Sequence, residues 1–515
     1  MQRFSHVKSA AVLGIDAYIL NVECHIQGGS LPKFITVGLP EGAVKESKER
    51  VLAAIKNLGF RIPGNKIVIN LAPADIKKDG SSLDLPIALG ILKSAGFINE
   101  GLIDNYVILG ELSLDGKIRP VKGALPISVS VKKHKHIKGI ILPKANAREA
   151  AITGELEIVG VEHIRDAVNF LNKTITIEQT KVNTDELFQQ SSTYLQDFMD
   201  VKGQENVKRA LEVAAAGGHN VLMIGPPGSG KTMMAKRLPT ILPKLTLGEA
   251  LETTKIHSVA GILPENEGII AHRPYRAPHH TISDAALVGG GRIPKPGEVS
   301  LSHHGVLFLD ELPEFKKNVL EVLRQPLENG TVTIARAQMS LTYPASFLLI
   351  AAMNPCPCGY ATDPRNECTC SSSQIQKYMA KISGPLLDRI DIHIEVPAVN
   401  LNDLGSKKTG EPSSIIRERV QQAREIQSQR FITYENIYAN AHMESKLIAK
   451  FCRLDHQSAE LLKQAMERLG LSARAYDRIL KVSRTIADLE HSPNIEMRHL
   501  SEAIQYRSLD RKMWL

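Results

Sequence analysis

The sequence predicts an α/β protein with three parts: an N-terminal α+β domain, a central α/β domain with a parallel sheet, and a C-terminal helical domain. A glycine-rich loop at 225–232 lies between an apolar run and a helical pattern, as in phosphate-binding parallel sheets. Helical spacing of apolar residues dominates from Ile415 onward. A chain of 515 residues is also too long for one hydrophobic core. We place the domains at 1–172, 197–400 and 401–515.

The N-terminal domain alternates apolar runs with short helical patterns. Runs 34–37 and 66–70 predict strands, and 46–58 predicts a helix with one apolar face. A polar stretch follows at 173–196, rich in Thr, Gln, Ser and Asn, which indicates a linker.

A turn in this first domain, Asp79-Gly80-Ser81-Ser82, resembles the nucleophile turn of the Lon proteolytic domain, with Ser82 in the nucleophile's place. Such a serine needs a base, which in Lon is a lysine. This sequence has Pro126 or Ile127 where that lysine belongs, and Lys122 comes four or five positions early. We therefore expect a Lon-protease-like fold without proteolysis. The role that remains is an oligomerisation and DNA-guiding collar.

The central domain begins with a complete phosphate-binding motif. Its residues are Gly225, Pro226, Pro227, Gly228, Ser229, Gly230, Lys231 and Thr232. Glycines let the backbone wrap a phosphate chain, and the N–H groups at the start of the following helix attract anions. Lys231 would reach the β- and γ-phosphates, and Thr232 would bind Mg²⁺. The motif predicts ATP and Mg²⁺ as ligands.

Two later apolar strands end in residues that suit ATP hydrolysis. The first ends in Asp310 and Glu311, which fit the Mg²⁺-holding carboxylate and the base that polarises the attacking water. The second ends in Asn354, which would stand beside the γ-phosphate. Arg389 follows a helix and precedes another strand, where it would reach a neighbouring subunit's γ-phosphate. Arg474 opens a helix of the last domain and would sense the phosphates from there.

Together these motifs resemble an AAA+ ATPase of the magnesium-chelatase-like group. Several longer stretches of the sequence resemble the ComM/YifB family in particular. These stretches are 273–283, 286–291, 303–315, 353–359 and 484–489. The resemblance implies a hexameric, ATP-driven DNA helicase that promotes branch migration while incoming DNA is integrated during natural transformation. Its implied partners are single-stranded and branched DNA, further copies of itself, and recombination proteins. The alternative is a chelatase-like ATPase that remodels a protein partner.

Four of the six cysteines crowd into one short segment as Cys356, Cys358, Cys368 and Cys370. In a reducing compartment such a cluster favours a metal over disulfides. Four thiolates suit a structural Zn²⁺, although the C-x-C spacing is less common than C-x-x-C. Reduced thiols without metal are the alternative.

Basic residues predict where DNA would lie. The formal net charge is +8, which favours a polyanionic partner. A hairpin pattern at 329–343 carries Arg336 near its tip, and lysines cluster at 132–138. A second insertion, 264–304, supplies Arg273, Arg276, Arg292 and Lys295. Such residues would bind phosphates without reading bases.

The last domain, 401–515, reads as a helical lid. Its predicted helices are 415–429, 443–451, 457–469, 473–490 and one from Met497. No apolar window approaches the length of a membrane span, and the first residues lack the apolar core of a signal peptide. We therefore expect a cytoplasmic protein that does not contact membranes.

Overall fold

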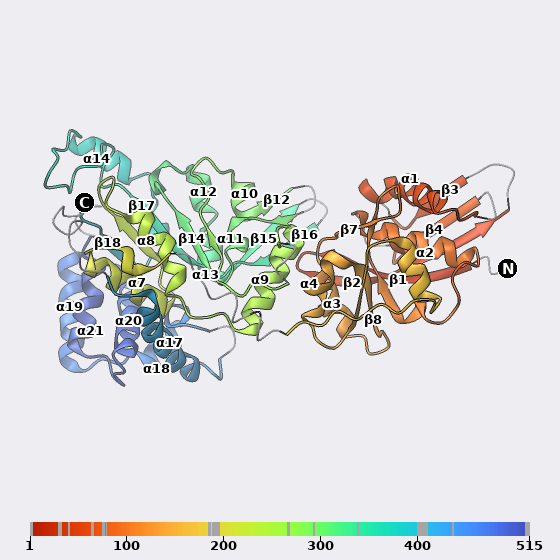
Figure 1. Ribbon diagram of the computed structural model, residues 1–515. Helices are drawn as coiled ribbons and strands as arrows, with labels where there is room; N and C mark the ends of the chain where they lie inside the picture. The colour runs from red at the N-terminus through yellow and green to blue at the C-terminus, as the bar shows by residue number, and fades with distance from the viewer. Residues whose placement is uncertain are drawn as a thin grey trace. The chain divides into compact units, whose positions relative to one another are not determined.

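The computed structural model divides the chain into two compact units. Unit 1 comprises Met1–Ser191 and Ala250–Ala271, and unit 2 comprises Ser192–Glu249 and His272–Leu515 (Figure 1). The structure describes residues 4–28, 33–39, 42–62, 66–74, 78, 80–183, 187, 196–264, 268–291, 294–336, 339–398, 410–434 and 437–509.

Unit 1 is built on a mixed sheet of seven strands. In spatial order they are β3 (Lys33–Val37), β4 (Lys66–Ala72), β2 (Asp16–Gln27), β1 (Phe4–Leu13), β5 (Tyr106–Ile108), β8 (Gly139–Pro143) and β9 (Glu157–Val161). The long strands β1, β2 and β4 pair antiparallel, whereas β5, β8 and β9 continue the sheet in parallel. Alternate residues of β1 and β2, among them Val7, Leu20 and Val22, are buried, so one face of the sheet forms the core.

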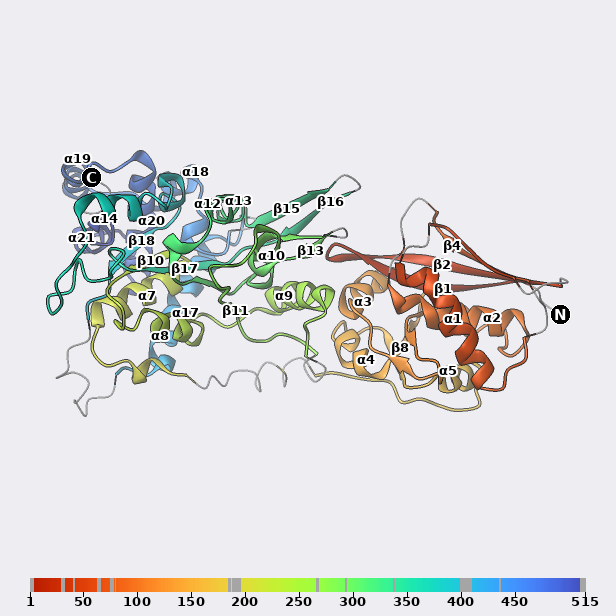
Figure 2. The ribbon, with the colours of Figure 1, turned by 90° about the horizontal axis from the view of Figure 1, so that it is seen from above.

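Helices cover the sheet of unit 1. They are α1 (Gly42–Asn57), α2 (Asp84–Ser94), α3 (Ala124–Lys132), α4 (Lys144–Ala151) and α5 (Ile164–Leu171). Figure 2 shows α1 and α2 on the same side of β1, β2 and β4. Helix α2 is mostly apolar and is buried along its whole length, as expected for a helix packed between a sheet and other helices.

The second stretch of unit 1 comes from within the residues that the sequence assigned to the ATPase core. Helix α9 (Leu247–Ala260) begins in unit 2 and ends in unit 1. The Ser258 hydroxyl donates to the Glu149 carboxylate at 2.5 Å, and the same carboxylate accepts the backbone N–H of Leu125 at 2.8 Å. These contacts hold residues 250–271 to α4. The linear sequence offers no pattern for such a docking because it depends on a partner about 100 residues earlier.

Unit 2 contains a parallel sheet of five strands. Their order is β11 (Tyr275–Arg276), β14 (Val306–Leu309), β17 (Leu348–Met353), β10 (Val221–Ile224) and β18 (Ile392–Glu395). All residues of β10, β14 and β17 are buried, which explains their unbroken apolar runs. The predicted parallel sheet is therefore confirmed.

Short helices and two hairpins surround this sheet. The helices are α7 (Glu205–Gly217), α8 (Lys231–Arg237), α10 (Asp284–Val288), α11 (Glu298–Leu301), α12 (Lys317–Glu321), α13 (Arg324–Asn329), α14 (Ser372–Met379) and α15 (Gly384–Leu387). The hairpins are β12 (Gly289–Gly290) with β13 (Lys295–Pro296), and β15 (Thr331–Arg336) with β16 (Met339–Pro344). The second hairpin is the one that the alternating pattern at 329–343 predicts.

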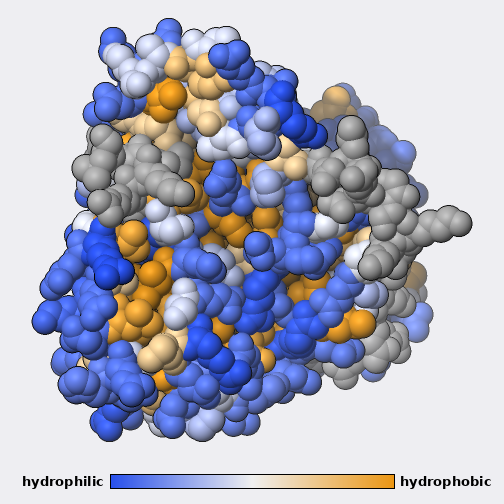
Figure 3. Space-filling view, turned by 90° about the vertical axis from the view of Figure 1, so that its left-hand side faces the viewer, coloured by the Kyte–Doolittle hydropathy of each residue, from blue (hydrophilic) through white to orange (hydrophobic). Residues whose placement is uncertain are grey.

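The predicted helical lid is also confirmed. Its helices are α17 (Ser413–Arg430), α18 (Ser445–Phe451), α19 (His456–Leu469), α20 (Ala473–Leu489) and α21 (Met497–Gln505). The Ser472 hydroxyl accepts the Ala475 N–H at 3.3 Å, which explains why α20 starts there. Figure 3 shows the face of unit 2 that carries α14, α19 and α21, on which apolar side chains gather between hydrophilic ones. None of the helices in the described ranges is long and apolar enough for a membrane crossing.

A buried polar network joins the lid to the sheet. The buried Asp391 carboxylate accepts Arg478 Nη1 at 2.6 Å and lies 3.1 Å from His219 Nδ1. The other ring nitrogen of His219 lies 2.8 Å from the Thr485 hydroxyl of α20. Although burial opposes it, the charge of Arg478 holds the pKa of Asp391 well below its usual range.

We expect Asp391→Ala to destabilise unit 2 by about 3–5 kcal/mol, because it leaves a buried histidine and an arginine without their shared partner. The matched control is Asp388→Ala, which removes a looser ion pair of 3.8 Å with Arg474. That change should cost no more than about 1 kcal/mol. Urea unfolding followed by circular dichroism measures both, and equal effects would contradict a special role for Asp391.

Candidate functional site

The phosphate-binding loop lies between β10 and α8, as its motif predicts. A side chain on Gly225 would strike the Val396 carbonyl, and Gly228 and Gly230 have φ of 74° and 91°, where glycine is favoured. Lys231 Nζ donates to the carbonyl oxygens of Gly225 at 2.7 Å and Pro226 at 2.9 Å. Burial lowers the pKa of Lys231, and the charge of Asp310 opposes that shift. The lysine is thus held in the concave side of the loop.

Parallel pairing brings the other predicted residues to the same edge of the sheet. Ile224 of β10 lies opposite Met353 of β17, and the Gly225 N–H donates to the Met353 carbonyl at 3.2 Å. Thr232 Oγ1 donates to Asp310 Oδ2 at 2.7 Å. Lys231 Nζ lies 3.3 Å from Asn354 Oδ1. A hydroxyl, a carboxylate, an amide and an ammonium group therefore meet where Mg²⁺ and phosphates can be held together.

Glu311 lies beside this group of side chains, and its backbone adopts a left-handed conformation. Its φ is 53°, and its side chain is 57% exposed. Its Oε2 lies 3.0 Å from His280 Nδ1, and the His280 ring lies against that of His279 with centroids 4.1 Å apart. His280 is therefore positioned to orient the Glu311 carboxylate.

Gln204, which precedes α7 with φ of 58°, also borders the phosphate loop and was not predicted from the sequence. Its Nε2 donates to the Ser229 carbonyl at 2.8 Å and to the Pro397 carbonyl at 3.0 Å. Its Oε1 is buried and has no hydrogen-bond partner among the described residues. A buried acceptor beside the phosphate loop can receive a hydrogen bond from an amino group such as that of adenine. A sequence feature that could have indicated this residue is its polar side chain just before α7, the helix that leads into β10.

Arg389 and Arg474 do not lie beside the loop of their own chain. The Arg389 carbonyl accepts Asn220 Nδ2 at 3.1 Å, and Asn220 precedes β10, whereas the loop follows it. A strand of this length separates its ends by about 13 Å. The Arg389 guanidinium pairs with Glu328 and is 6% exposed. Arg474 is 62% exposed and lies 3.8 Å from Asp388. The two arginines thus sit together at the edge opposite the phosphate loop.

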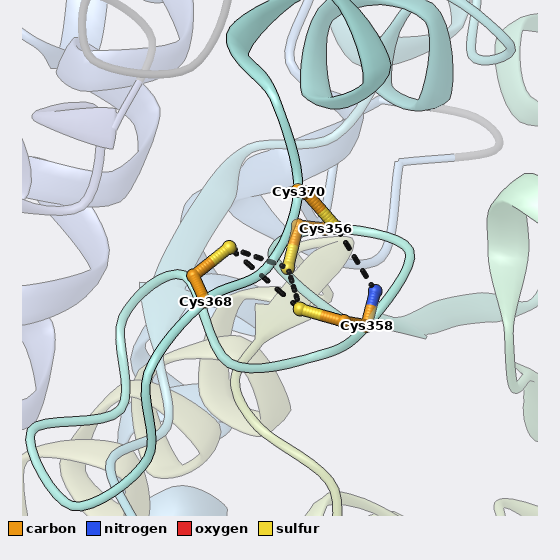
Figure 4. A group of neighbouring side chains, drawn as sticks. All are labelled: Cys356, Cys358, Cys368 and Cys370. Carbon is orange, nitrogen blue, oxygen red and sulfur yellow. Dashed lines mark hydrogen bonds between the residues drawn. The ribbon is translucent and has the colours of Figure 1, made fainter.

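The four clustered cysteines converge in space. Figure 4 shows the sulfurs of Cys356, Cys358 and Cys368 turned toward one another. Their Sγ–Sγ separations are 3.3, 3.7 and 3.6 Å, and all four sulfurs lie within 4.8 Å of one another. A tetrahedral zinc site with Zn–S bonds of about 2.3 Å has edges of about 3.8 Å. A hydrogen bond from the Tyr360 backbone lowers the pKa of Cys358 to about 6, and thiolate is the form that binds metals. The cluster fits Zn²⁺.

Two of the predicted DNA contacts form ion pairs within the chain. Arg273 is 11% exposed in its side chain, and it donates to the carbonyls of Pro243 and His304 at 2.6 and 2.7 Å while pairing with Glu249. Arg276 makes a two-pronged pair with Glu298 at 2.6 and 2.7 Å. Guanidinium groups engaged in this way stabilise the fold, and they would have to leave these partners to bind phosphates. Helical and loop periodicity could not reveal these partners because they lie more than twenty residues away.

The other predicted DNA-facing residues lie at hairpin ends. Lys295 is exposed in β13, and Arg336 closes β15 opposite Met339 at the turn of its hairpin. Arg292 lies outside the described residues. These three assignments stay predictions.

Ser82 in unit 1 lies in the short 3₁₀ turn Ser81–Leu83 that precedes α2. Within the described residues, no side chain hydrogen-bonds to its hydroxyl. Its neighbour Ser81 instead donates to Glu111. Asp79 lies outside the described residues. A serine without a basic partner is not activated as a nucleophile.

Family comparisons place both units in one class. The model described as "Magnesium chelatase, subunit ChlI" matches residues 197–404, "Subunit ChlI of Mg-chelatase" matches 22–146, and the corresponding C-terminal model matches 410–507. The class is therefore the magnesium-chelatase-like AAA+ proteins. "Competence protein ComM" of Haemophilus influenzae is 44% identical over 98% of this chain and 97% of its own. YifB of Escherichia coli is 43% identical with the same coverage.

The chain thus belongs to the ComM/YifB family of magnesium-chelatase-like AAA+ proteins. More distantly, the magnesium-chelatase 38 kDa subunit of Rhodobacter capsulatus is 25% identical over 31% of this chain and 50% of its own length.

Two substitutions separate nucleotide binding from turnover. Lys231→Ala should weaken ATP binding by about 1.5–3 kcal/mol, because charged hydrogen bonds to the phosphates are lost. Glu311→Gln should bind ATP normally and slow hydrolysis about 10²–10⁴-fold, since the base is removed. Binding of a fluorescent ATP analogue and steady-state phosphate release measure the two effects. Normal turnover in Glu311→Gln would exclude this residue as the base.

Proposed function

We propose that this protein is an ATP-driven DNA translocase, active as a hexameric ring, that promotes branch migration while incoming DNA is integrated during natural transformation and recombination. The proposal is carried by the assembled site around Thr232 and Asp310, in a chain whose full length matches a relative named "Competence protein ComM". Single-stranded and branched DNA are its proposed partners, with recombination proteins as further ones.

In this proposal each residue at the phosphate-binding edge has a separate role in ATP hydrolysis. Water would attack the γ-phosphorus of bound MgATP, and the bond to the oxygen that bridges the β- and γ-phosphates would break as ADP leaves. Lys231 and the loop N–H groups hold the ATP phosphates, and Thr232 and Asp310 hold the metal ion. Glu311 accepts the proton of the attacking water, and His280 keeps the carboxylate turned toward its place. Asn354 orients that water.

Ring assembly would complete the site. Arg389 and Arg474 lie together at the edge away from the phosphate loop of their own chain. In a ring this edge would face the next subunit, and Arg389 would leave its pair with Glu328 to reach that subunit's γ-phosphate. An arginine supplied in this way stabilises the charge of the transition state. Exposed apolar side chains such as Ile415 and Met497, each 45% exposed, would be covered in such a contact.

The DNA-binding part of the proposal rests on charge. The chain carries a formal net charge of +8, and the hairpin β15–β16 ends in Arg336. In unit 1, Lys133, Lys135 and Lys138 are all exposed beside one another. Such residues would bind the phosphate backbone independently of base sequence and with strong salt dependence.

The second candidate is a remodeller of a protein partner, which the 25% identity with a magnesium-chelatase subunit favours. The same phosphate-binding edge would serve both functions. DNA dependence separates them, because a remodeller needs no nucleic acid for its activity.

A branch-migration assay tests the proposal. The purified protein is incubated with ATP and a three-stranded DNA intermediate, and the displaced strand is measured. We expect displacement that needs ATP and is lost in Glu311→Gln. If the wild-type protein hydrolyses ATP but displaces no strand from any branched substrate, the remodeller becomes the better account.

Arg389→Ala should lower ATP turnover by about 10³-fold or more while leaving ATP binding intact. Mixing Arg389→Ala with Glu311→Gln subunits should restore part of the turnover, because one subunit supplies the glutamate and its neighbour supplies the arginine. If Arg389 acted within its own chain, no mixed ring would contain a complete site. Absence of restoration in rings shown to be mixed would therefore contradict the assignment.

A further inference from the structure

The cysteine cluster begins immediately beside the predicted γ-phosphate residue. Strand β17 ends at Met353, Asn354 follows, and Cys356 comes two residues later with its side chain fully buried. A metal ion that holds the four cysteines together would therefore also restrain the backbone of Asn354.

The cluster also touches the phosphate-binding loop. Gly359 has a φ of 91°, and a side chain there would lie 2.7 Å from the Cγ and Cδ atoms of Pro227. The same hypothetical Cβ would lie 3.9 Å from the Asn354 side chain. The backbone between the first two cysteines and the rest of the cluster thus packs directly on the loop, in a space that admits only glycine.

The second half of the cluster leads back to the same site through α14. The Tyr378 hydroxyl receives a hydrogen bond from the Asn354 backbone, and burial raises the pKa of this phenol to about 12. Lys381, just beyond α14, lies 3.1 Å from Glu314, which is three residues after Glu311. Cys370 is joined to this helix by a single residue, Ser371. The segment after the first two cysteines therefore packs on the loop, and the helix after the last two cysteines brings Tyr378 to Asn354 and Lys381 to Glu314.

Hydrophobic burial does not hold the outer part of the cluster. Between residues 361 and 370 the structure buries no apolar side chain, and the one covered carboxylate, Asp363, accepts hydrogen bonds from Arg365 and Asn366 of the same segment. A polar segment of this kind needs a cross-link to keep one conformation, and four converging thiolates on a metal ion provide it.

We propose that the metal-loaded cluster of Cys356, Cys358, Cys368 and Cys370 stabilises the phosphate loop and Asn354 in the conformation that binds nucleotide. The affinity for ATP would then depend on the bound metal. The proposal rests on the proposed ATP binding and on zinc as the ion. Metal loss would release the Gly359 contact with Pro227 and the Tyr378 contact with Asn354, without altering any residue that touches ATP.

The first test uses Cys368→Ser in the full-length protein, with Thr369→Ala as the matched control in the same exposed segment. Bound zinc is measured by atomic spectroscopy, and affinity by titration with a fluorescent ATP analogue. Cys368→Ser should lose the zinc and bind nucleotide at least about tenfold more weakly, which corresponds to about 1.4 kcal/mol. Thr369→Ala should keep both properties. A chelator selective for zinc over magnesium should reproduce the Cys368→Ser result in the wild-type protein.

The second test keeps the metal and disturbs only the contact. Gly359→Ala should retain zinc and yet weaken nucleotide binding, because its methyl group displaces Pro227. Combining it with Pro227→Ala should restore part of the affinity. Gly470→Ala is the control, since Gly470 also has a positive φ of 63° but no neighbour within 4 Å of its hypothetical Cβ.

The outcomes are separable. Unchanged nucleotide affinity in zinc-free protein, or a wild-type protein that takes up no zinc when supplied with it, would overturn the inference alone. Failure of the zinc-loaded wild-type protein to bind ATP would overturn the proposed function instead.

Discussion

Parallel pairing of β17 with β10 and β14 is the constraint on which the site depends. It aligns the carboxyl ends of three strands, so that side chains far apart in sequence meet at one edge. The Thr232 hydroxyl reaches Asp310 at 2.7 Å and Lys231 reaches Asn354 at 3.3 Å only because this register is kept. A slip of one residue would move the side chains that follow these strands away from one another and separate the groups of the site.

The two edges of this sheet, at the carboxyl and amino ends of its strands, hold different groups of residues. One edge holds the phosphate loop, Asp310 and Asn354, with the cysteine cluster packed against it. The opposite edge gathers Arg389, the Asp391 network and the start of α20. His219 and Arg478 share Asp391, and this network joins lid helix α20 to that edge of the sheet. In the proposed ring, the network would link the lid to the edge that faces the next nucleotide site.

Local patterns allowed much of this to be predicted from the sequence. The phosphate loop, the strand ends at Asp310 and Asn354, and the lid helices follow from short-range rules of glycine usage, burial and helical periodicity. What could not be predicted depends on distant partners. The pairing of Arg273 with Glu249, the docking of Ser258 on Glu149 and the contact of His280 with Glu311 join residues 24 to 109 positions apart. For a basic residue in an insertion, the sequence alone does not show whether the side chain contacts DNA or forms an ion pair within the protein.

The most direct test of the central claim is steady-state ATP hydrolysis by the wild-type protein, with and without single-stranded and branched DNA. The account predicts strong stimulation by DNA that weakens with rising salt and disappears in Glu311→Gln. Hydrolysis that depends on Glu311 but is indifferent to every DNA would contradict the motor on DNA and would point to a protein partner.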